Sequence, residues 1–489
     1  MRRCCRTSSS STTSGSTAPR ARRAERAADP STGELLCTAV EGGKEDAEKA
    51  VGAAHAAFAN FKKTTARSRA RLLRQLNDLL LENQEDIARL IVAENGKPWK
   101  EALAEVTYSA SFLEWFSGEA ERAYGATIPA ANPASRIMTI KQPIGVVAAL
   151  APWNLPLAMA ARKVAAAIAA GCTVVVKPAG ETPYATAVFG VLAKRAGVPK
   201  GVVNVITALE NTALIGETLC TDPRVRKVSF TGSTRVGKLL VKLTADTLKK
   251  LSLELGGNAP VIVFDDANVK KAVDGVIVSK LRNGGQTCVA ANRLLVQKGI
   301  LDAFLKELKT RMEGMAVGGG LDHNSAIGPL ISQAALKKVD EHTQDALSKG
   351  ATQYWQHPAS PLTPERFAKG NFYPPTIVVG LTENMKVWEE ETFGPLAAIK
   401  VFEKEEEVEK LANDTRVGLG AYLYTQDIGR ALRVAESIHA GMVGINTGML
   451  SASESPFGGV GESGWGKEGS LMGIEDYVVT KAINIDISA

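Results

Sequence analysis

Residues 225–237 have the sequence VRKVSFTGSTRVG, a β-branched run that leads into a glycine-containing turn and the start of a helix. Glycine at such a turn lets the backbone approach a pyrophosphate, and the helix N-terminus supplies free N–H groups and a favourable dipole. Gly232 and Gly237 follow the pattern G-x-x-x-x-G, which differs from the usual G-x-G-x-x-G of dinucleotide-binding turns. The stretch therefore predicts a βα unit with a candidate phosphate site; a tight βα connection without a ligand is the alternative.

Similar β-branched runs lie on both sides of this unit, and Ala-rich stretches of helical length separate several of them. Strands that alternate with helices in this way predict βαβ units and mostly parallel sheets. We predict an α/β fold with two Rossmann-like parallel-sheet domains in series, divided near residues 254–257. The predicted strands cover residues 144–149, 173–176, 202–206, 225–230, 260–264, 293–296 and 397–401.

The remaining segments are predicted from composition and periodicity. Residues 43–123 carry apolar positions at helical spacing, such as Leu72, Leu76 and Leu79, and predict two or three amphipathic helices. Residues 357–370 contain three prolines and predict a long surface loop. A length of 489 residues fits two to four domains and excludes a disulfide-stapled miniprotein.

The net charge of +6 lies entirely in the first 26 residues, which hold seven Arg and one acid. The other 463 residues carry 51 bases and 51 acids, so we expect neither a nucleic-acid partner nor a membrane partner. The most apolar stretch, residues 144–161, is interrupted by Pro152, Asn154 and Pro156, which argues against a membrane span.

Residues 1–27 are rich in Arg, Ser and Thr, poor in acids and without a long apolar stretch. We expect this segment to be disordered or removed, and its composition favours a mitochondrial transit peptide over a secretory signal. A disordered tail of a cytoplasmic protein, or a start codon assigned too far upstream, is the alternative. The six cysteines show no spacing typical of a disulfide framework or a metal site.

Three residues stand where chemistry could occur. Lys177 ends a predicted buried strand, Glu254 lies among apolar residues before two glycines, and Cys288 follows a glycine pair. Lys177 could bind a ligand, Glu254 could act as a general base, and Cys288 could act as a thiolate nucleophile. Each also has an ordinary interpretation: a lysine that reaches solvent, a glutamate that caps a turn, and a small buried hydrophobe.

Seven short motifs follow one another along the chain: Pro152–Asn154, Lys177–Pro178, Phe230–Ser233, Glu254–Gly257, Gly285–Cys288, Glu391–Pro395 and Pro456–Gly459. This ordered set resembles the aldehyde dehydrogenase superfamily over residues 29–485. The resemblance implies a cofactor domain, a catalytic domain and a small oligomerisation arm. Longer strings at residues 252–260, 444–448 and 473–477 are most similar to the succinate-semialdehyde dehydrogenases.

The resemblance assigns the reaction to three residues. Cys288 would attack the aldehyde carbon, the Asn154 amide and the Cys288 N–H would hold the oxyanion, and Glu254 would activate the hydrolytic water. The cofactor would be NADP or NAD. Its binding residues would be Trp153, Lys177, Gly180, Gly232, Ser233, Gly237, Leu255, Glu391 and Phe393, and no metal is expected.

The succinate-semialdehyde dehydrogenase resemblance also implies a site for the substrate carboxylate. Arg162 and Arg282 occupy the matching positions, with Ser451 as a further hydrogen-bond donor. Guanidinium suits this role because it binds carboxylate bidentately and stays charged when partly buried. Surface salt bridges are the alternative for each arginine.

The chain departs from the family pattern at three points. Ala290 stands where many members have a second cysteine, so no local redox switch is expected. Gly180 stands where NAD-preferring members have a glutamate, which predicts acceptance of NADP and a shift toward NAD in Gly180→Glu. The family's first β-hairpin is expected to be absent before Asp29–Gly33.

We accordingly predict oxidation of succinate semialdehyde by a homodimer or homotetramer, with glutarate semialdehyde or another ω-carboxy or aliphatic aldehyde as the alternative. An inactive structural or ligand-binding homologue is the non-enzyme alternative. The predicted units are residues 28–254 for the cofactor domain with an arm near 125–142, 255–445 for the catalytic domain, and 446–489 for a segment that completes the cofactor domain and arm.

Overall fold

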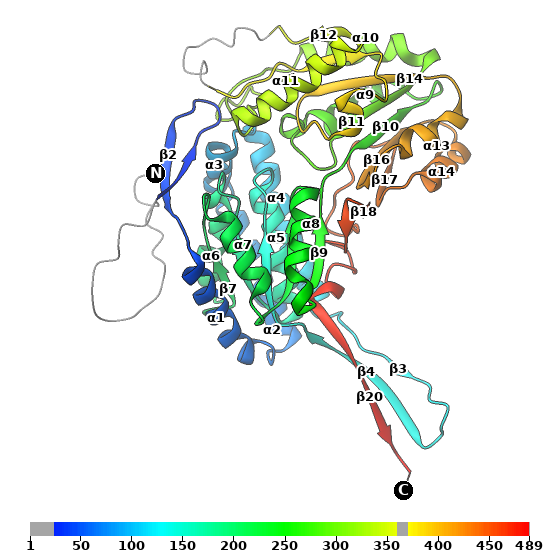
Figure 1. Ribbon diagram of the computed structural model, residues 1–489. Helices are drawn as coiled ribbons and strands as arrows, with labels where there is room; N and C mark the ends of the chain where they lie inside the picture. The colour runs from blue at the N-terminus through cyan, green and yellow to red at the C-terminus, as the bar shows by residue number, and fades with distance from the viewer. Residues whose placement is uncertain (1–23, 359–369, 489) are drawn as a thin grey trace.

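The computed structural model describes residues 24–358 and 370–488. Two mainly parallel sheets with helices around them form the body, and a narrow antiparallel sheet projects from it (Figure 1). The predicted α/β class with two parallel sheets is confirmed. The division of the chain into domains stays a prediction, although β9 of the first sheet ends at Glu254 and β10 of the second begins at Ala259.

The first sheet has the strand order β19-β9-β8-β5-β6-β7, and its strands run parallel except for β19 at the edge. Helices cover both faces, which explains why β5 and β6 are buried along their whole length. The strands are β5 (Val146–Leu150), β6 (Thr173–Lys177), β7 (Val203–Val205), β8 (Val225–Thr231), β9 (Lys250–Glu254) and β19 (Gly464–Trp465).

The second sheet has the order β12-β13-β14-β11-β10-β16-β17 and is antiparallel only at β12. Its strands are β10 (Ala259–Val263), β11 (Ala291–Gln297), β12 (Thr352–Gln356), β13 (Thr376–Val379), β14 (Leu396–Phe402), β16 (Gly420–Tyr424) and β17 (Met442–Ile445). Its helices are α9 (Val269–Leu281), α10 (Leu301–Glu313), α11 (Gln333–Ser348), α12 (Lys386–Glu389), α13 (Glu405–Asn413) and α14 (Ile428–Ser437).

The arm is a three-stranded sheet of β3 (Thr127–Ile128), β4 (Ser135–Pro143) and β20 (Val478–Asp486). β20 pairs with β4 over nine residues, so the end of the described chain lies beside a segment more than 300 residues earlier. A further small pair joins β15 (Val417–Gly418) to β18 (Val460–Gly461). The arm extends away from both large sheets in Figure 1.

Two predictions for the N-terminal end are wrong. β1 (Ala24–Ala28) pairs antiparallel with β2 (Leu35–Val40), so a β-hairpin is present and the segment predicted to lack structure does not extend to residue 27. Asp29–Gly33 forms the turn: the Asp29 carboxylate accepts from the Ser31 N–H at 2.7 Å, and Gly33 adopts a positive φ of 73°. Residues 1–23 and most of the predicted 357–370 loop lie outside the described residues.

The region from residue 43 to 123 forms four helices instead of two or three. Thr65 caps the second helix by accepting from the Ser68 N–H, and Gly96, with a φ of 81°, ends the third. These helices are α1 (Lys44–Phe61), α2 (Ala66–Glu82), α3 (Gln84–Asn95) and α4 (Trp99–Glu119), and those between the first sheet's strands are α5 (Pro156–Ala170), α6 (Pro183–Arg195), α7 (Thr212–Thr221) and α8 (Thr234–Thr244).

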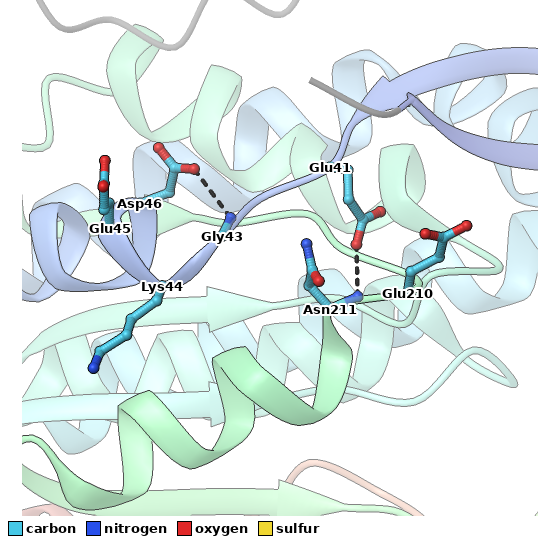
Figure 2. Close-up of a pocket in the computed structure, with 7 residues that line it drawn as sticks. All are labelled: Glu41, Gly43, Lys44, Glu45, Asp46, Glu210 and Asn211. Carbon is cyan, nitrogen blue, oxygen red and sulfur yellow. Dashed lines mark hydrogen bonds between the residues drawn. The ribbon is translucent and has the colours of Figure 1, made fainter. Parts of the chain in front are cut away.

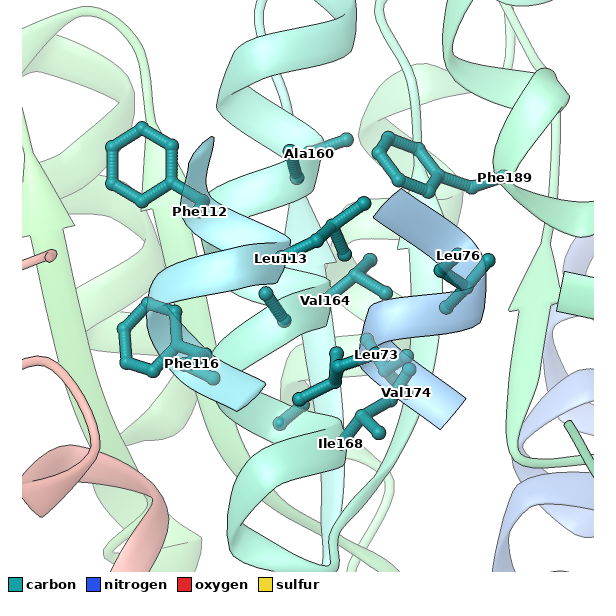
Figure 3. Packing of buried hydrophobic residues seen from close by; sticks show 14 of the residues in the cluster. Leu73, Leu76, Phe112, Leu113, Phe116, Ala160, Val164, Ile168, Val174 and Phe189 are labelled. Carbon is teal, nitrogen blue, oxygen red and sulfur yellow. The ribbon is translucent and has the colours of Figure 1, made fainter. Parts of the chain in front are cut away.

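The largest apolar cluster packs α2 and α4 against α5, all 15 residues of which are buried. Alanines on α5 permit close packing on every side, and Figure 3 shows Leu113 of α4 beside Val164 of α5, with Leu76 of α2 near Phe189 of α6. Burial of each large apolar side chain here contributes about 1.5–3 kcal/mol. This cluster holds α4 and α5 in place beneath the residues that follow β5.

Two leucines of α2 give a test of this packing. Leu76 is buried, whereas Leu81 is 41% exposed. We expect Leu76→Ala to lower the free energy of unfolding by about 2–5 kcal/mol, measured from the urea transition, because it leaves a cavity. Leu81→Ala, the matched control, should change it by less than about 1 kcal/mol. Equal effects of the two substitutions would contradict the packing described.

Candidate active site

The carboxyl edge of the first sheet meets the amino edge of the second. Asn154 follows β5 and Glu254 ends β9, whereas Cys288 precedes β11 and Glu391 precedes β14. The Asn154 Nδ2 donates to the Gln286 carbonyl at 3.0 Å across this junction. Three predicted catalytic residues are thus carried to one junction by separate elements.

The segment before Cys288 is a constrained left-handed turn. Asn283, Gly284 and Gly285 have φ values of 52°, 63° and 79°, a region that favours glycine. A Cβ on Gly285 would lie 2.3 Å from a backbone oxygen, so no larger residue fits. The Gln286 side chain donates to the Asn283 carbonyl and accepts from the Ile331 N–H. The glycine pair therefore fixes the approach to the thiol.

The Cys288 thiol is half-buried in an environment that favours its neutral form. Burial, reinforced by the negative charges of Glu391 and Glu254, raises the pKa of Cys288 to about 12, and Arg162 and Arg282 oppose this only in part. The side chain is therefore a thiol at neutral pH in the ligand-free protein. Nucleophilic attack would need its proton to be removed as the new bond forms.

Glu254 is the buried carboxyl of the site, with 1% of the residue exposed. Neither of its side-chain oxygens has a hydrogen-bond partner among the described residues. Burial and the nearby Glu468 raise the pKa of Glu254 well above its ordinary value, against the opposing charges of Lys163 and Arg162. An unpaired carboxyl of this kind suits proton transfer.

Glu468 joins two cations of α5 behind the site. Its Oε2 accepts from Arg162 Nη1 at 3.2 Å and its Oε1 accepts from Lys163 Nζ. Lys163 also donates to the Thr231 hydroxyl at 2.7 Å. Sequence reasoning missed Glu468 and Lys163; two adjacent cations, Arg162-Lys163, inside an Ala-rich buried helix were the available signal.

The two predicted carboxylate-binding arginines differ in their partners. Arg162 is buried, donates to Glu468 and the Tyr108 hydroxyl, and lies 4.5 Å from the Phe457 ring centroid. Arg282 is half-buried and forms no ion pair with any described residue; its Nη1 contacts the Met449 sulfur at 3.5 Å. The Nε of each arginine lacks a partner in the described part of the chain. Both therefore retain donors for an anionic ligand, and Arg282 retains more of them.

The predicted phosphate turn has the features expected of an anion cradle. Ser233 caps α8 by accepting from the Val236 N–H, and the Gly232 N–H donates to the Glu254 carbonyl. A Cβ on Gly237 would lie 2.5 Å from Leu255, so Gly237 lets α8 approach the end of β9. The other first-turn N–H groups of α8 can bind an anion.

The predicted adenosine side is close-packed around Gly180. Lys177 Nζ donates to the Thr212 hydroxyl at 2.7 Å. A Cβ on Gly180 would lie 2.4 Å from Leu209 Cδ1 and 2.8 Å from its Cα. Gly180→Glu therefore requires the Leu209 backbone to move, so it would not test cofactor charge preference alone.

The predicted nicotinamide side combines aromatic and acidic groups. The Trp153 and Phe393 rings meet edge to face, with centroids 5.6 Å apart, and Phe393 has a φ of 59°. The Glu391 carboxylate accepts from the Gly257 N–H at 3.2 Å, and burial raises the pKa of Glu391 to about 7 against Lys338 and Lys280. Ser451 is half-buried in the loop between β17 and β18.

A surface cavity of about 510 Å³ lies elsewhere, between the start of α1 and the start of α7 (Figure 2). None of the predicted site residues lines it. The Glu41 carboxylate accepts from the Asn211 N–H at 2.7 Å, and its other lining groups include Glu45, Asp46 and Glu210. Its carboxylates disfavour an anionic ligand such as a dinucleotide phosphate.

Residues 24–358 and 370–488 contain neither a candidate metal-binding cluster nor a helix suited to span a membrane. No group of three or more His, Cys, Asp or Glu side chains there could hold a metal ion. No helix in the same residues is long and apolar enough to cross a membrane.

Among known proteins, the family model described as "Aldehyde dehydrogenase family" matches residues 17–483. The chain belongs to the aldehyde dehydrogenase family. It is 48% identical over 459 residues to a Pseudomonas putida protein named glutarate-semialdehyde dehydrogenase, with 94% of each chain covered. It is also 48% identical to a Mus musculus protein named mitochondrial succinate-semialdehyde dehydrogenase, with 93% and 86% covered.

A solved structure gives the same result for the fold. The crystal structure titled as an Escherichia coli NADP dependent enzyme superposes with a TM-score of 0.92 at 48% identity, with 95% of each chain covered. Membership of the aldehyde dehydrogenase family makes the chain an oxidoreductase, and the family resemblance inferred from the motifs is confirmed.

The environment of Cys288 predicts a steep pH dependence of its reactivity. Since its pKa is about 12 in the ligand-free protein, the thiolate fraction increases with pH throughout the neutral range. We expect inactivation by iodoacetamide to accelerate about tenfold per pH unit between about pH 7 and 9. Mass spectrometry of the Cys288 peptide, with the Cys37 peptide as the control, measures this rate. A plateau below about pH 8 would contradict the described environment.

Proposed function

We propose that this aldehyde dehydrogenase oxidises succinate semialdehyde to succinate with NADP or NAD. The observation that carries the proposal is the combination of Cys288, the Asn154 amide and the unpaired Glu254 carboxyl with Arg282, which has no ion-pair partner among the described residues. The similarity to proteins named for succinate and glutarate semialdehydes supports a substrate with a terminal carboxylate.

Cys288 forms the covalent bond to the substrate. Its sulfur attacks the aldehyde carbon while the thiol proton passes to water, and the carbonyl oxygen becomes the oxyanion of a thiohemiacetal. One N–H of the Asn154 amide is occupied by Gln286, so the other N–H and the Cys288 backbone N–H are the donors for the oxyanion. These donors stabilise charge that exists only after attack, which lowers the barrier.

The cofactor supplies the hydride acceptor that oxidises the thiohemiacetal to a thioester. The residues fit its binding: the first turn of α8 after Gly232 and Ser233 suits the pyrophosphate, and Lys177 suits ribose or phosphate oxygens. Trp153, Glu391 and Phe393 suit the nicotinamide side. The E. coli structure titled NADP dependent supports NADP, and Gly180 offers no carboxylate that would repel a 2′-phosphate.

Glu254 performs the hydrolytic half of the reaction. Its ionised carboxylate takes a proton from water, which attacks the thioester and releases succinate and the Cys288 thiol. Burial keeps the carboxyl protonated more readily than in water, and Lys163 and Arg162 favour the ionised form that the step needs.

Arg282 and Arg162, with Ser451, bind the substrate carboxylate. Arg282 contributes most, because Arg162 already donates to Glu468 and Tyr108. Glutarate semialdehyde, one methylene longer, is the second candidate because the P. putida relative carries that name. Comparison of the two semialdehydes and butanal with both cofactors tests the proposal, and equal or higher kcat/KM for butanal would overturn it.

We further propose a homodimer or homotetramer assembled through the arm of β3, β4 and β20. Exposed apolar residues on it, including Ile128, Met138 and Ile485, support an interface there. We propose a mitochondrial location on the Arg- and Ser-rich composition of residues 1–23 and the mouse relative's name. A cytoplasmic location is the alternative.

Substitution of Glu254, the proposed base, should produce an initial burst of reduced cofactor. Glu254→Gln should slow turnover about 10²- to 10⁴-fold and leave the thioester on Cys288. Rapid-mixing absorbance at 340 nm should then show about one equivalent of reduced cofactor per site before a slow steady state.

In the unaltered enzyme, thioester hydrolysis should accelerate as pH rises through the raised pKa of Glu254, because only the ionised form acts as a base. This acceleration should be absent in the variant, and steady turnover without a burst would contradict the assignment.

Substitution of Arg282 should reduce activity only with aldehydes that carry a carboxylate. Arg282→Gln should lower kcat/KM for succinate semialdehyde about 10- to 100-fold, because a hydrogen bond to a charged group contributes about 1.5–3 kcal/mol. Steady-state rates with butanal should change by less than about threefold, since butanal has no carboxylate. Arg433→Gln, at an exposed ion pair with Glu405, is the matched control. An equal loss of kcat/KM with both aldehydes would show that Arg282 does not bind the substrate carboxylate.

A further inference from the structure

One face of α4 holds three separate segments of the active site. Glu101, Glu105 and Tyr108 are spaced four and three residues apart, so their side chains share a helix face. Glu101 Oε2 accepts from the Asn283 N–H at 2.7 Å, and the Tyr108 hydroxyl accepts from Arg162 Nη2 at 2.6 Å. α4 therefore contacts both the turn before Cys288 and an arginine of the proposed carboxylate site.

Glu105, between them, contacts the segment that carries Asn154. Its Oε1 accepts from the N–H groups of Leu157 and Ala158 at 2.9 and 3.3 Å, which satisfies the first turn of α5. Its Oε2 accepts from Lys97 Nζ at 2.5 Å. Carboxylate charge at a helix N-terminus is favourable, so this residue anchors α5 relative to α4.

Lys97 completes the connection to Asn154. Its Nζ donates to the Asn154 backbone carbonyl at 2.7 Å, and the Asn283 side chain donates to the same carbonyl at 2.9 Å. The Asn154 residue is thus held by its backbone from one side, while its amide contacts the Gln286 carbonyl on the other.

Stability alone does not account for this pair. The side chains of Lys97 and Glu105 are 1% and 0% exposed, and taking two charges out of water carries a large desolvation penalty. Apolar residues of similar size can replace such pairs without loss of stability. The specific contribution of this pair is geometric, because its ammonium is aimed at one backbone carbonyl.

We propose that Lys97, held by Glu105, is a positioning residue that sets the Asn154 amide where the oxyanion forms. The inference rests on the proposed function, since it assigns to Lys97 a role in the attack of Cys288 on a carbonyl. Lys97 does not touch substrate in this role; it acts through Asn154. Its loss lets the 153–157 segment shift, and a small displacement of an oxyanion donor costs much of its effect.

A double-mutant cycle with Asn154→Ala tests the proposal. Lys97→Met should lower kcat for succinate semialdehyde about 10- to 100-fold and change KM by less than about threefold. In the Asn154→Ala background the same substitution should change kcat by less than about threefold, since the group it positions is absent. Losses that multiply independently in the two backgrounds would overturn the proposal.

The rate of Cys288 alkylation distinguishes the proposed role from a general structural defect, because such a defect would change this rate. Attack of Cys288 on iodoacetamide forms no carbonyl oxyanion, so Lys97→Met should leave the alkylation rate within about twofold of the unaltered enzyme. Equal losses of alkylation and turnover would overturn the proposal. Lys298→Met, at an exposed ion pair with Glu403, is the control and should change neither rate.

A second variant guards against misfolding. Lys97→Met leaves the Glu105 carboxylate buried without its cation, whereas the pair Lys97→Met with Glu105→Gln is neutral and keeps an oxygen for the α5 N–H groups. The pair variant should fold, as shown by its urea transition, and show the same kcat loss; full activity would overturn the proposal. Absence of cofactor reduction by the unaltered enzyme with every aldehyde would instead show that the proposed function is wrong.

Discussion

The hydrogen bond from the Asn154 amide to the Gln286 carbonyl joins the two parallel sheets where their edges meet. Asn154 belongs to the turn after a strand of the first sheet, and Gln286 to the turn before a strand of the second. The rest of the site depends on this junction, because Cys288 lies two residues after Gln286 and Glu254 ends a strand of the facing edge. The proposed nucleophile, oxyanion donor and base therefore come from the facing edges of two different sheets.

The pKa values of Glu254 and Cys288 depend on their burial and on the charged side chains around them. Glu468 accepts from both Arg162 and Lys163, which leaves Glu254 without a hydrogen-bonded partner in the described residues. Burial raises the pKa of both Glu254 and Cys288; Lys163 and Arg162 oppose this at Glu254, and Arg162 and Arg282 oppose it at Cys288. Both groups are therefore weaker acids than in water, and each must lose its proton before it can act in the proposed reaction.

Close backbone approaches limit where side chains can be added. A Cβ on Gly257 would lie 2.4 Å from the Cys288 carbonyl oxygen, and one on Gly180 would lie 2.4 Å from Leu209. The first glycine lets the chain pass from one sheet to the other beside the thiol. The second means that a substitution of Gly180 changes packing as well as charge, because any side chain there displaces the segment that leads into α7.

The sequence by itself determined the family, the α/β class and strands β5 to β8, β10, β11 and β14, because strand periodicity and the Asn154, Glu254 and Cys288 motifs are local patterns. Strands β9, β12, β13, β16 and β17 were not predicted. Tertiary structure alone decided the partners of these residues. Glu468 pairs with α5 across about 305 residues of chain, and Lys97, paired with Glu105, reaches Asn154 across 57 residues. The N-terminal hairpin was likewise missed, since strand pairing depends on register and not on composition. Local patterns show which residue types are present, whereas through-space contacts decide whether an arginine remains available for a substrate or is already bound to a carboxylate.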